Sequence, residues 1–147
     1  MKVSALLDAK GKEVFSIEAD KTIEDAIRSM GARKISAMMV SENGKTVGIF
    51  TERDVVRCYI ATDGKSFKDI KLREFMVTKL ITADPEDDVN DIAATMVEKN
   101  IRHLPVLNDN TVIGMLSIRD IIQTQVGKLT SENTYLRGYI TGNESGH

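Results

Sequence analysis

The sequence predicts a mixed α/β (α+β) protein built from two similar halves, each with the element order β-α-β-β-α, related by pseudo-twofold symmetry. Three observations indicate this fold: an internal repeat, apolar residues at helical spacing in each copy, and a polar turn between two short apolar runs. The chain has 147 residues, of which 41% are apolar and 29% charged. This composition is typical of a globular protein and excludes a disordered, fibrous or low-complexity chain.

The internal repeat aligns residues 14–57 with residues 80–123 at a constant offset of 66 residues and without a gap. The agreement is best where GIFTERDVV at 48–56 lies over GMLSIRDII at 114–122. One copy, about 45 residues long, is too short to close a core by itself. We therefore expect the two copies to pack against each other and to leave two equivalent clefts between them.

Each copy begins with a short apolar run, VFSI at 14–17 and LIT at 80–82, which predicts a strand. Apolar residues then recur at helical spacing over 22–33 and 88–99. Both of these segments begin with a residue, Thr or Asp, that is favoured as an N-cap. A helix is therefore expected after the first strand of each copy.

A β-hairpin is expected next in each copy, because two apolar runs are separated by a polar turn. The turns contain Asn43-Gly44 in the first copy and Asn108-Asp109-Asn110 in the second. A second helix is expected to start at Thr51 and, in the other copy, at Ser117.

The remaining segments lead into the two copies or follow them. A lead-in helix is expected near 3–9 with a counterpart near 68–75, and the polar stretch 62–70 is expected to be the linker. The chain thus divides into residues 1–64, 65–128 and 129–147. In the last part Tyr135, Leu136, Tyr139 and Ile140 form one apolar stripe, which predicts a packed helix over 131–141.

The start of the second helix carries the chemical signal, with Thr51 at the first turn and Asp54 three residues later. Helix capping alone explains this pair, because the hydroxyl accepts from first-turn N–H groups and the acid suits the positive end of the helix dipole. The same geometry suits a nucleotide, because free N–H groups bind phosphate and a carboxylate accepts ribose hydroxyls. Arg53 and its counterpart Arg119 are unfavourable at that helix end, which favours an anion in the cleft or an acidic partner.

The two copies of this motif, GIFTERD and GMLSIRD, resemble the G-h-x-[ST]-x-x-D motif of cystathionine-β-synthase (CBS) domains. KISAMMV and NIRHLPV are similar to the second-strand segment of that family, and IEADKTIEDA and TADPEDDVNDI to its first strand and helix. The resemblance covers about residues 3–128 and indicates a tandem pair, or Bateman module. The tail SENTYLRGYITG resembles that of stand-alone two-CBS proteins, which have no attached catalytic domain.

The resemblance implies a regulatory, energy-sensing module that binds AMP, ADP, ATP or NAD, with Mg²⁺ at the phosphates conceivable, and signals to a partner protein. Each implied site combines the helix start of one copy with the first-strand and hairpin segments of the other. One site would comprise Thr51, Arg53, Asp54, Thr82, Ile92, Ile101, Arg102 and His103. The other would comprise Ser117, Arg119, Asp120, Ser16, Ala26, Ile35, Ser36 and Ala37. Arg102 and His103 make the first of these sites more cationic, so a preference for phosphate-rich ligands is expected there.

Two other functional classes compete with ligand sensing: a ligand-free dimerisation or scaffold module, and an enzyme acting on a nucleotide. The intact Asp54 and Asp120 favour a ligand-binding module over an empty scaffold. The sequence shows no convincing nucleophile and base pair, so neither a catalytic residue nor a catalytic cofactor is expected. Two histidines and the single Cys58 leave no His-rich or Cys-based metal site and no intramolecular disulfide.

Charge and apolar patterning predict the setting of the protein. The net charge is −2, and no apolar stretch approaches the length of a membrane span. A cytoplasmic protein that binds neither membrane nor nucleic acid is therefore expected. A homodimer is also expected, because the second helices are apolar beyond one face. The residues concerned are Val55, Val56, Tyr59, Ile60, Ile121, Ile122 and Val126.

Overall fold

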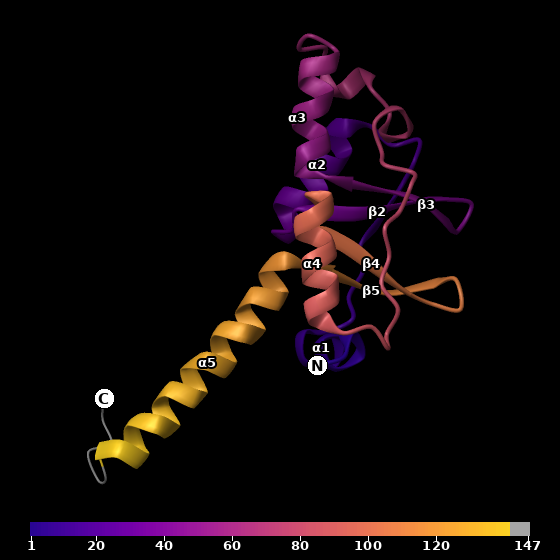
Figure 1. Ribbon diagram of the computed structural model, residues 1–147. Helices are drawn as coiled ribbons and strands as arrows, with labels where there is room; N and C mark the ends of the chain where they lie inside the picture. The colour runs from indigo at the N-terminus through magenta and orange to yellow at the C-terminus, as the bar shows by residue number, and fades with distance from the viewer. Residues whose placement is uncertain (142–147) are drawn as a thin grey trace.

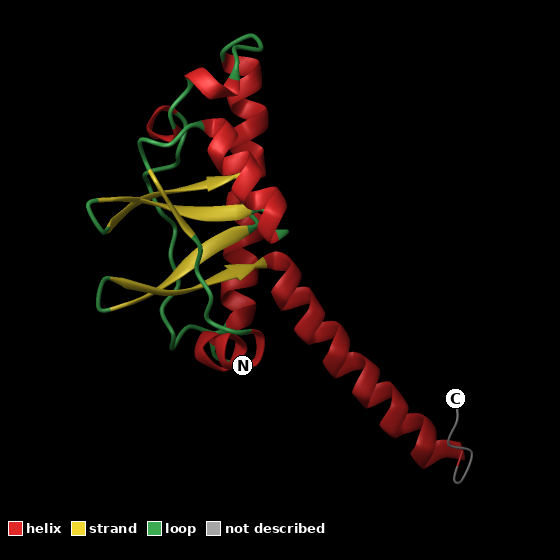
Figure 2. Cartoon of the chain, turned by 180° about the vertical axis from the view of Figure 1, so that it is seen from behind, coloured by secondary structure: helices red, strands yellow, loops and turns green. Residues whose placement is uncertain are grey.

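The computed structural model describes the backbone of residues 1–141 and the side chains of residues 1–129. Its two halves lie side by side, with the hairpin β2–β3 next to the hairpin β4–β5 and the helices α2, α3 and α4 along one side of the sheets (Figures 1 and 2). This arrangement of mixed helices and strands in two repeats confirms the predicted fold class.

The first repeat contains a complete three-stranded sheet of order β1-β2-β3, with β1 parallel to β2 and β2 antiparallel to β3. Its elements are β1 (Ser16–Glu18), α2 (Ile23–Arg33), β2 (Ala37–Glu42), β3 (Lys45–Thr51) and α3 (Glu52–Ala61). The predicted N-cap of α2 is confirmed, because the Thr22 hydroxyl accepts a hydrogen bond from the Asp25 N–H at 3.1 Å.

The second repeat follows the same order. Its elements are α4 (Val89–Lys99), β4 (His103–Asn108), β5 (Thr111–Ser117) and α5 (Ile118–Thr141). The two hairpins turn at equivalent positions, Asn43-Gly44 and Asp109-Asn110, and all four residues have positive φ. Such a turn matches the twist of the flanking strands, which explains why Asn, Asp and Gly occupy it.

The predicted first strand of the second repeat, at 80–82, is wrong. Only one parallel bridge forms there, between Ala83 and Val106. In the first repeat, the Met39 N–H donates to Phe15 O and the Ala19 N–H donates to Ser41 O. The residues equivalent to these two donors are Pro105 and Pro85, which have no N–H. The ladder therefore loses the bond on each side of Ala83, and the segment is too short for a strand.

The two lead-in segments differ in structure. The first forms the predicted helix, α1 (Val3–Lys10), but its counterpart at 68–75 forms two 3₁₀ turns, η1 (Phe67–Asp69) and η2 (Leu72–Glu74). Between these turns Ile70 is extended, and its carbonyl accepts from the Ile23 N–H while the Leu72 N–H donates to Lys21 O. These bonds to the start of α2 take the place of helical ones, so the helix predicted there is wrong.

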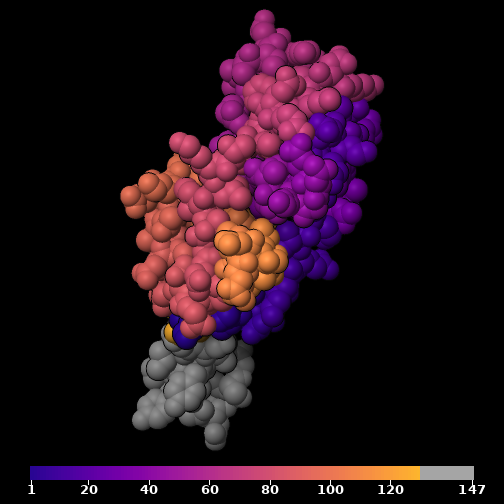
Figure 3. All heavy atoms as spheres, turned by 90° about the vertical axis from the view of Figure 1, so that its right-hand side faces the viewer, coloured from indigo at the N-terminus to yellow at the C-terminus, as the bar shows by residue number. Residues whose placement is uncertain are grey.

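Each lead-in segment packs into the core of the other repeat. From α1, Val3, Leu6 and Leu7 join the core of the second repeat. From the linker, Ile70 and Leu72 join the core of the first. Figure 3 shows this crossing, with indigo N-terminal atoms reaching the second repeat at the lower end and pink linker atoms lying over the first repeat at the upper end.

The helix predicted over 131–141 is part of one continuous helix, α5, which runs from Ile118 to Thr141. Its first turns pack on the second repeat, and it then extends away from the body of the molecule (Figure 1). The packing predicted for its last turns concerns side chains outside the described residues. In the part of the chain that the structure describes, no helix is long and apolar enough to cross a membrane.

Candidate ligand-binding clefts

Two neighbouring clefts lie between the repeats, with volumes of about 1060 Å³ and 450 Å³. We name them after the acid of the repeated motif that lines each: the larger is the Asp120 cleft and the smaller the Asp54 cleft. Both are lined by residues of both repeats, and Ser36, Glu52 and His103 line both clefts. The clefts therefore share one wall.

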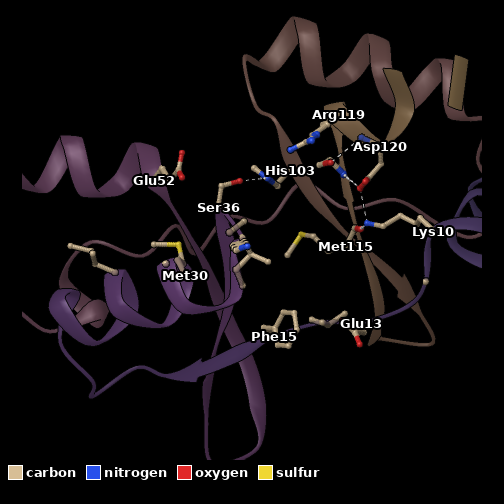
Figure 4. Close-up of a pocket in the computed structure, with 18 of the residues that line it drawn as sticks. Lys10, Glu13, Phe15, Met30, Ser36, Glu52, His103, Met115, Arg119 and Asp120 are labelled. Atoms are coloured by element: carbon tan, nitrogen blue, oxygen red, sulfur yellow. Dashed lines mark hydrogen bonds and ion pairs between the residues drawn. The ribbon is translucent and has the colours of Figure 1, made fainter. Parts of the chain in front are cut away.

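The Asp120 cleft combines the start of α5 with the start of β2 and the segment after α1 (Figure 4). Lys10, Arg119 and Asp120 lie together on one side of it, while Phe15 lies beside Glu13, and Glu52 and Met30 lie on the side away from Lys10. Its lining residues are Lys10, Gly11, Glu13, Val14, Phe15, Ile27, Met30, Gly31, Lys34, Ile35, Ser36, Ala37, Glu52, Val55, His103, Met115, Ser117, Arg119 and Asp120.

Asp120 caps its own helix and also holds a lysine from the other end of the chain. The Ser117 N–H donates to Asp120 Oδ2 at 3.1 Å, and the Asp120 N–H donates to Ser117 Oγ at 3.0 Å. Lys10 Nζ lies 2.6 Å from Asp120 Oδ2 and also donates to Met115 O. Burial raises the pKa of Asp120, but the hydrogen bonds from Lys10 and Ser117 outweigh it and bring the pKa below its ordinary value. The carboxylate is therefore ionised at neutral pH.

The Asp54 cleft combines the start of α3 with the start of β4 and the segment before α4. Its lining residues are Ser36, Ile49, Thr51, Glu52, Arg53, Asp54, Val56, Val77, Lys79, Leu80, Ile81, Ile101, Arg102, His103 and Pro105. Asp54 accepts the Thr51 N–H at 2.9 Å and pairs with Arg57 at 3.1 Å. Its side chain is 5% exposed, against 21% for Asp120. The capping interpretation thus holds at both acids, and both acids also reach a cleft wall.

Arg53 has a structural partner that the sequence did not reveal. Its guanidinium donates to the carbonyl of Asn100, the C-cap residue of α4. A helix C-terminus carries partial negative charge, so this contact explains Arg53 without any ligand. Arg119 lines the Asp120 cleft beside Asp120 and His103 (Figure 4).

His103 joins the two repeats at the wall shared by the clefts. Its Nε2 and the Ser36 hydroxyl are 2.9 Å apart and share a hydrogen bond. Burial lowers the pKa of His103, and the Asp120 charge offsets only part of that effect. The ring is therefore neutral at neutral pH and faces both clefts, so it does not make the Asp54 cleft the more cationic one. Each cleft has three basic side chains: Lys10, Lys34 and Arg119 in one, and Arg53, Lys79 and Arg102 in the other.

Most of the residues that the sequence assigned to two sites line the expected clefts. Around Asp54 these are Thr51, Arg53, Ile101, Arg102 and His103, and around Asp120 they are Ser117, Arg119, Ile35, Ser36 and Ala37. Four residues line neither cleft. Ala26 and Ile92 are buried in the two cores, where helix residues on the apolar face must lie. Ser16 and Thr82 are exposed elsewhere.

Lys10 and the wall formed by Glu13 and Phe15 were not predicted. No motif marks these residues, because they reach the cleft only through the crossing of α1 to the second repeat. Among the residues that the structure describes, no group of three or more His, Cys, Asp or Glu side chains could hold a metal ion.

The CBS domain family model matches residues 8–61 and 72–127. The mitochondrial CBS domain-containing protein CBSX3 of Arabidopsis thaliana is 35% identical over 95% of this chain and 72% of its own length. A crystal structure of a CBS domain has 36% identity and a TM-score of 0.82, covering 86% of this chain and 98% of that chain. A CBS domain pair in complex with 5′-methylthioadenosine and S-adenosyl-L-methionine has 26% identity and a TM-score of 0.75, covering 87% and 98%.

Proposed function

The chain belongs to the CBS domain family, of which it carries two copies, and from this premise we propose that it is a regulatory module and not an enzyme. In this proposal its two clefts bind adenosine-containing ligands, and occupancy is passed to a partner protein. One observation carries it: each cleft sets the hydroxyl-x-x-Asp helix start of one repeat against the hairpin of the other. A related CBS pair with this fold is complexed with two adenosine derivatives.

The chemistry of the walls suits the parts of a nucleotide. Apolar side chains such as Ile35 and Met30 in one cleft, or Ile101 and Ile81 in the other, can enclose an adenine ring. The carboxylate of the motif can accept hydrogen bonds from both ribose hydroxyls. The helix N-terminus and the basic side chains can hold phosphate.

We propose AMP, ADP, ATP and NAD as the ligands to test first, with 5′-methylthioadenosine and S-adenosyl-L-methionine as adenosine derivatives without a phosphate. The clefts carry equal numbers of basic side chains, so charge does not separate them. Volume does separate them. The Asp120 cleft has a volume of about 1060 Å³ and the Asp54 cleft about 450 Å³, so the Asp120 cleft offers more than twice the space. The larger ligands, NAD and ATP, are therefore assigned to the Asp120 cleft.

The test replaces each acid by asparagine. Asp54→Asn and Asp120→Asn keep an oxygen that can accept the capping hydrogen bonds, so the fold is retained while the charge facing ribose is lost. Each change should cost about 2–4 kcal/mol of binding at its own cleft and leave the other unchanged. Isothermal titration calorimetry with the six compounds measures this. If neither variant differs from the parent with any bound compound, the ribose role is wrong. If the parent binds none of them, the ligand-free scaffold is the better account.

We also propose a homodimer, supported by an exposed apolar face on α3 and the first turns of α5. Ile60 is 73% exposed, and Val56 and Tyr59 beside it are 59% exposed. Ile121, which was assigned to this face, lies buried in the core of the second repeat, and Val55 packs on the core of the first. Light scattering should give twice the chain mass of 16.3 kDa at micromolar concentration, and a stable monomer would contradict the dimer.

A further inference from the structure

On α5, the apolar side chains between Ile122 and Leu129 have no cover in the described part of the chain. At 24 residues, the helix is about 36 Å long. Ile121 anchors its first turns in the core, and Gln125 Nε2 donates to Asn90 Oδ1 at 3.1 Å. Beyond this contact the helix leaves the body of the molecule (Figure 2). Helices in proteins are stabilised mainly by packing an apolar face against another surface.

The exposed apolar residues of α5 follow the spacing of a coiled coil. Ile122, Val126 and Leu129 are 51%, 53% and 59% exposed and are separated by four and then three residues. The same alternation continues in the sequence through Asn133, Leu136 and Ile140. In heptad notation, Val126, Asn133 and Ile140 occupy a positions, and Ile122, Leu129 and Leu136 occupy d positions.

The residue types at the a and d positions favour one orientation and one number of paired helices. β-Branched residues at a with leucine at d favour a parallel pair of helices, and a single asparagine at a fixes register and oligomeric state. The charged residues beside the a and d positions also favour a parallel pair. Glu132 occupies a g position and precedes Arg137, at the next e position, by five residues. In a parallel pair this spacing brings the acid of one helix to the base of the other.

We propose that α5 pairs with α5 of a second copy of this chain as a short parallel two-stranded coiled coil over residues 122–140. The occupant of the apolar seam is thus the same helix of another protomer, in register, with Asn133 opposite Asn133. This inference deepens the proposed homodimer: it assigns Ile122 and Val126 of that apolar face to a helix pair along α5, and it does not use the exposed residues of α3. It also places the ends of the two helices together, away from the ligand clefts, where a regulated partner has access to them.

The test is disulfide crosslinking at one d position. In a parallel, in-register pair, position 129 faces its own equivalent, so Leu129→Cys should form a covalent dimer on mild oxidation. Lys128→Cys is the matched control, because the neighbouring c position points away from the seam. Cys58 is fully buried, so the introduced thiol is the accessible one. Leu129→Cys should crosslink at least tenfold more completely than Lys128→Cys on a non-reducing gel.

A second variant tests the role of the asparagine. Asn133→Leu should raise the melting temperature of the assembly and yield species larger than a dimer by light scattering, because the polar residue that restricts the oligomeric state is removed. If the parent is a dimer but Leu129→Cys crosslinks no better than Lys128→Cys, the coiled coil is wrong and the dimer through α3 stands. A monomeric parent overturns both, whatever the outcome of ligand titration.

Discussion

At the scale of single residues, the two acids of the repeated motif differ in their partners. Asp54 pairs with Arg57 of its own helix and is almost fully buried. Asp120 pairs with Lys10, which comes from α1 and lines the same cleft. A ribose that binds Asp120 competes with this ammonium group for the carboxylate. Displaced from Asp120, the ammonium group is then free to bind a phosphate of the same ligand.

Lys10 should therefore distinguish nucleotides from nucleosides in the Asp120 cleft. Lys10→Met introduces the residue found at the equivalent position of the other lead-in segment, Met76. ATP should bind about tenfold more weakly, because a charge-assisted hydrogen bond is lost. Adenosine should bind as well or better, because no ion pair needs to be broken. Calorimetry with ATP and with adenosine measures both affinities. An equal loss of affinity for the two compounds would contradict this role of Lys10.

His103 should make stability depend on pH. Because burial holds its pKa below the ordinary value, the unfolded chain binds the proton first as the pH falls. The stability that His103 contributes is therefore full above about pH 6.5 and is lost as the pH falls from there toward the folded pKa. His103→Gln removes the titration and keeps a partner for Ser36. Urea unfolding near pH 7.5 and pH 5.5 gives the free energy of unfolding at each pH. Between these values the variant should lose less of this free energy than the parent, and an equal loss would contradict the role of His103.

At the scale of elements, the glycine that opens each motif permits a lead-in segment to cross a strand. A Cβ at Gly48 would lie 2.8 Å from Val77 O, and a Cβ at Gly114 would lie 2.7 Å from Leu7 Cδ2. The Val77 contact is part of the bridge between β3 and the chain before α4, where the Ile49 N–H donates to Val77 O. The glycines thus serve close approach, as a glycine in a strand interior commonly does.

Gly48→Ala should destabilise the fold by about 1–3 kcal/mol, because the obstacle is backbone and cannot rotate away. Gly114→Ala should cost less, since the end of the Leu7 side chain can shift. Gly31→Ala is the control, as nothing lies within 4 Å of its added Cβ and alanine in a helix is better than glycine by about 1 kcal/mol. Chemical denaturation gives all three values. A Gly48→Ala protein as stable as Gly31→Ala would mean that the crossing tolerates more space than the structure shows.

At the scale of the whole molecule, the crossed lead-in segments and the shared cleft wall make the repeats interdependent. Each core contains a segment from the far side of the molecule, and His103 and Ser36 connect the repeats between the two clefts. A ligand in either cleft contacts both repeats. It can therefore shift their relative position, but only as far as its affinity differs between the two arrangements.

The crossing predicts which repeat each lead-in segment stabilises. Leu6→Ala should cost about 2–5 kcal/mol, since Leu6 is fully buried and a cavity remains. Hydrogen exchange should show the loss of protection first in α4, β4 and β5, which surround it. Leu72→Ala is the mirror control and should affect α2, β2 and β3 first. Loss of protection in the first repeat for Leu6→Ala would contradict the crossed packing.

The repeat, the helices α2 and α4 with their caps, and both hairpin turns were predictable from the sequence alone. These features depend on neighbours within a few residues: helical spacing, one N-cap side chain, and residues that tolerate positive φ in a tight turn. The repeated motif also pointed to the two clefts, because a helix start exposes N–H groups whatever the rest of the fold does. The lining residues Ile35, Ser36, Arg102 and His103 came from the family resemblance.

Features that depend on packing between distant segments became visible only in the folded chain. Pro85 and Pro105 were visible in the sequence, but their effect required the register that pairs Ala83 with Val106. Ile121 and Ile122 are neighbours in α5, but Ile121 is buried and Ile122 is about half exposed. The apolar residues at the start of α5 cover more than one helix face, so their spacing does not indicate which face packs on the core. Lys10 reaches Asp120 across 110 positions of sequence, because α1 packs on the second repeat. Such contacts follow from which surfaces bury the most apolar area together, and that is a property of the folded chain and not of any short segment.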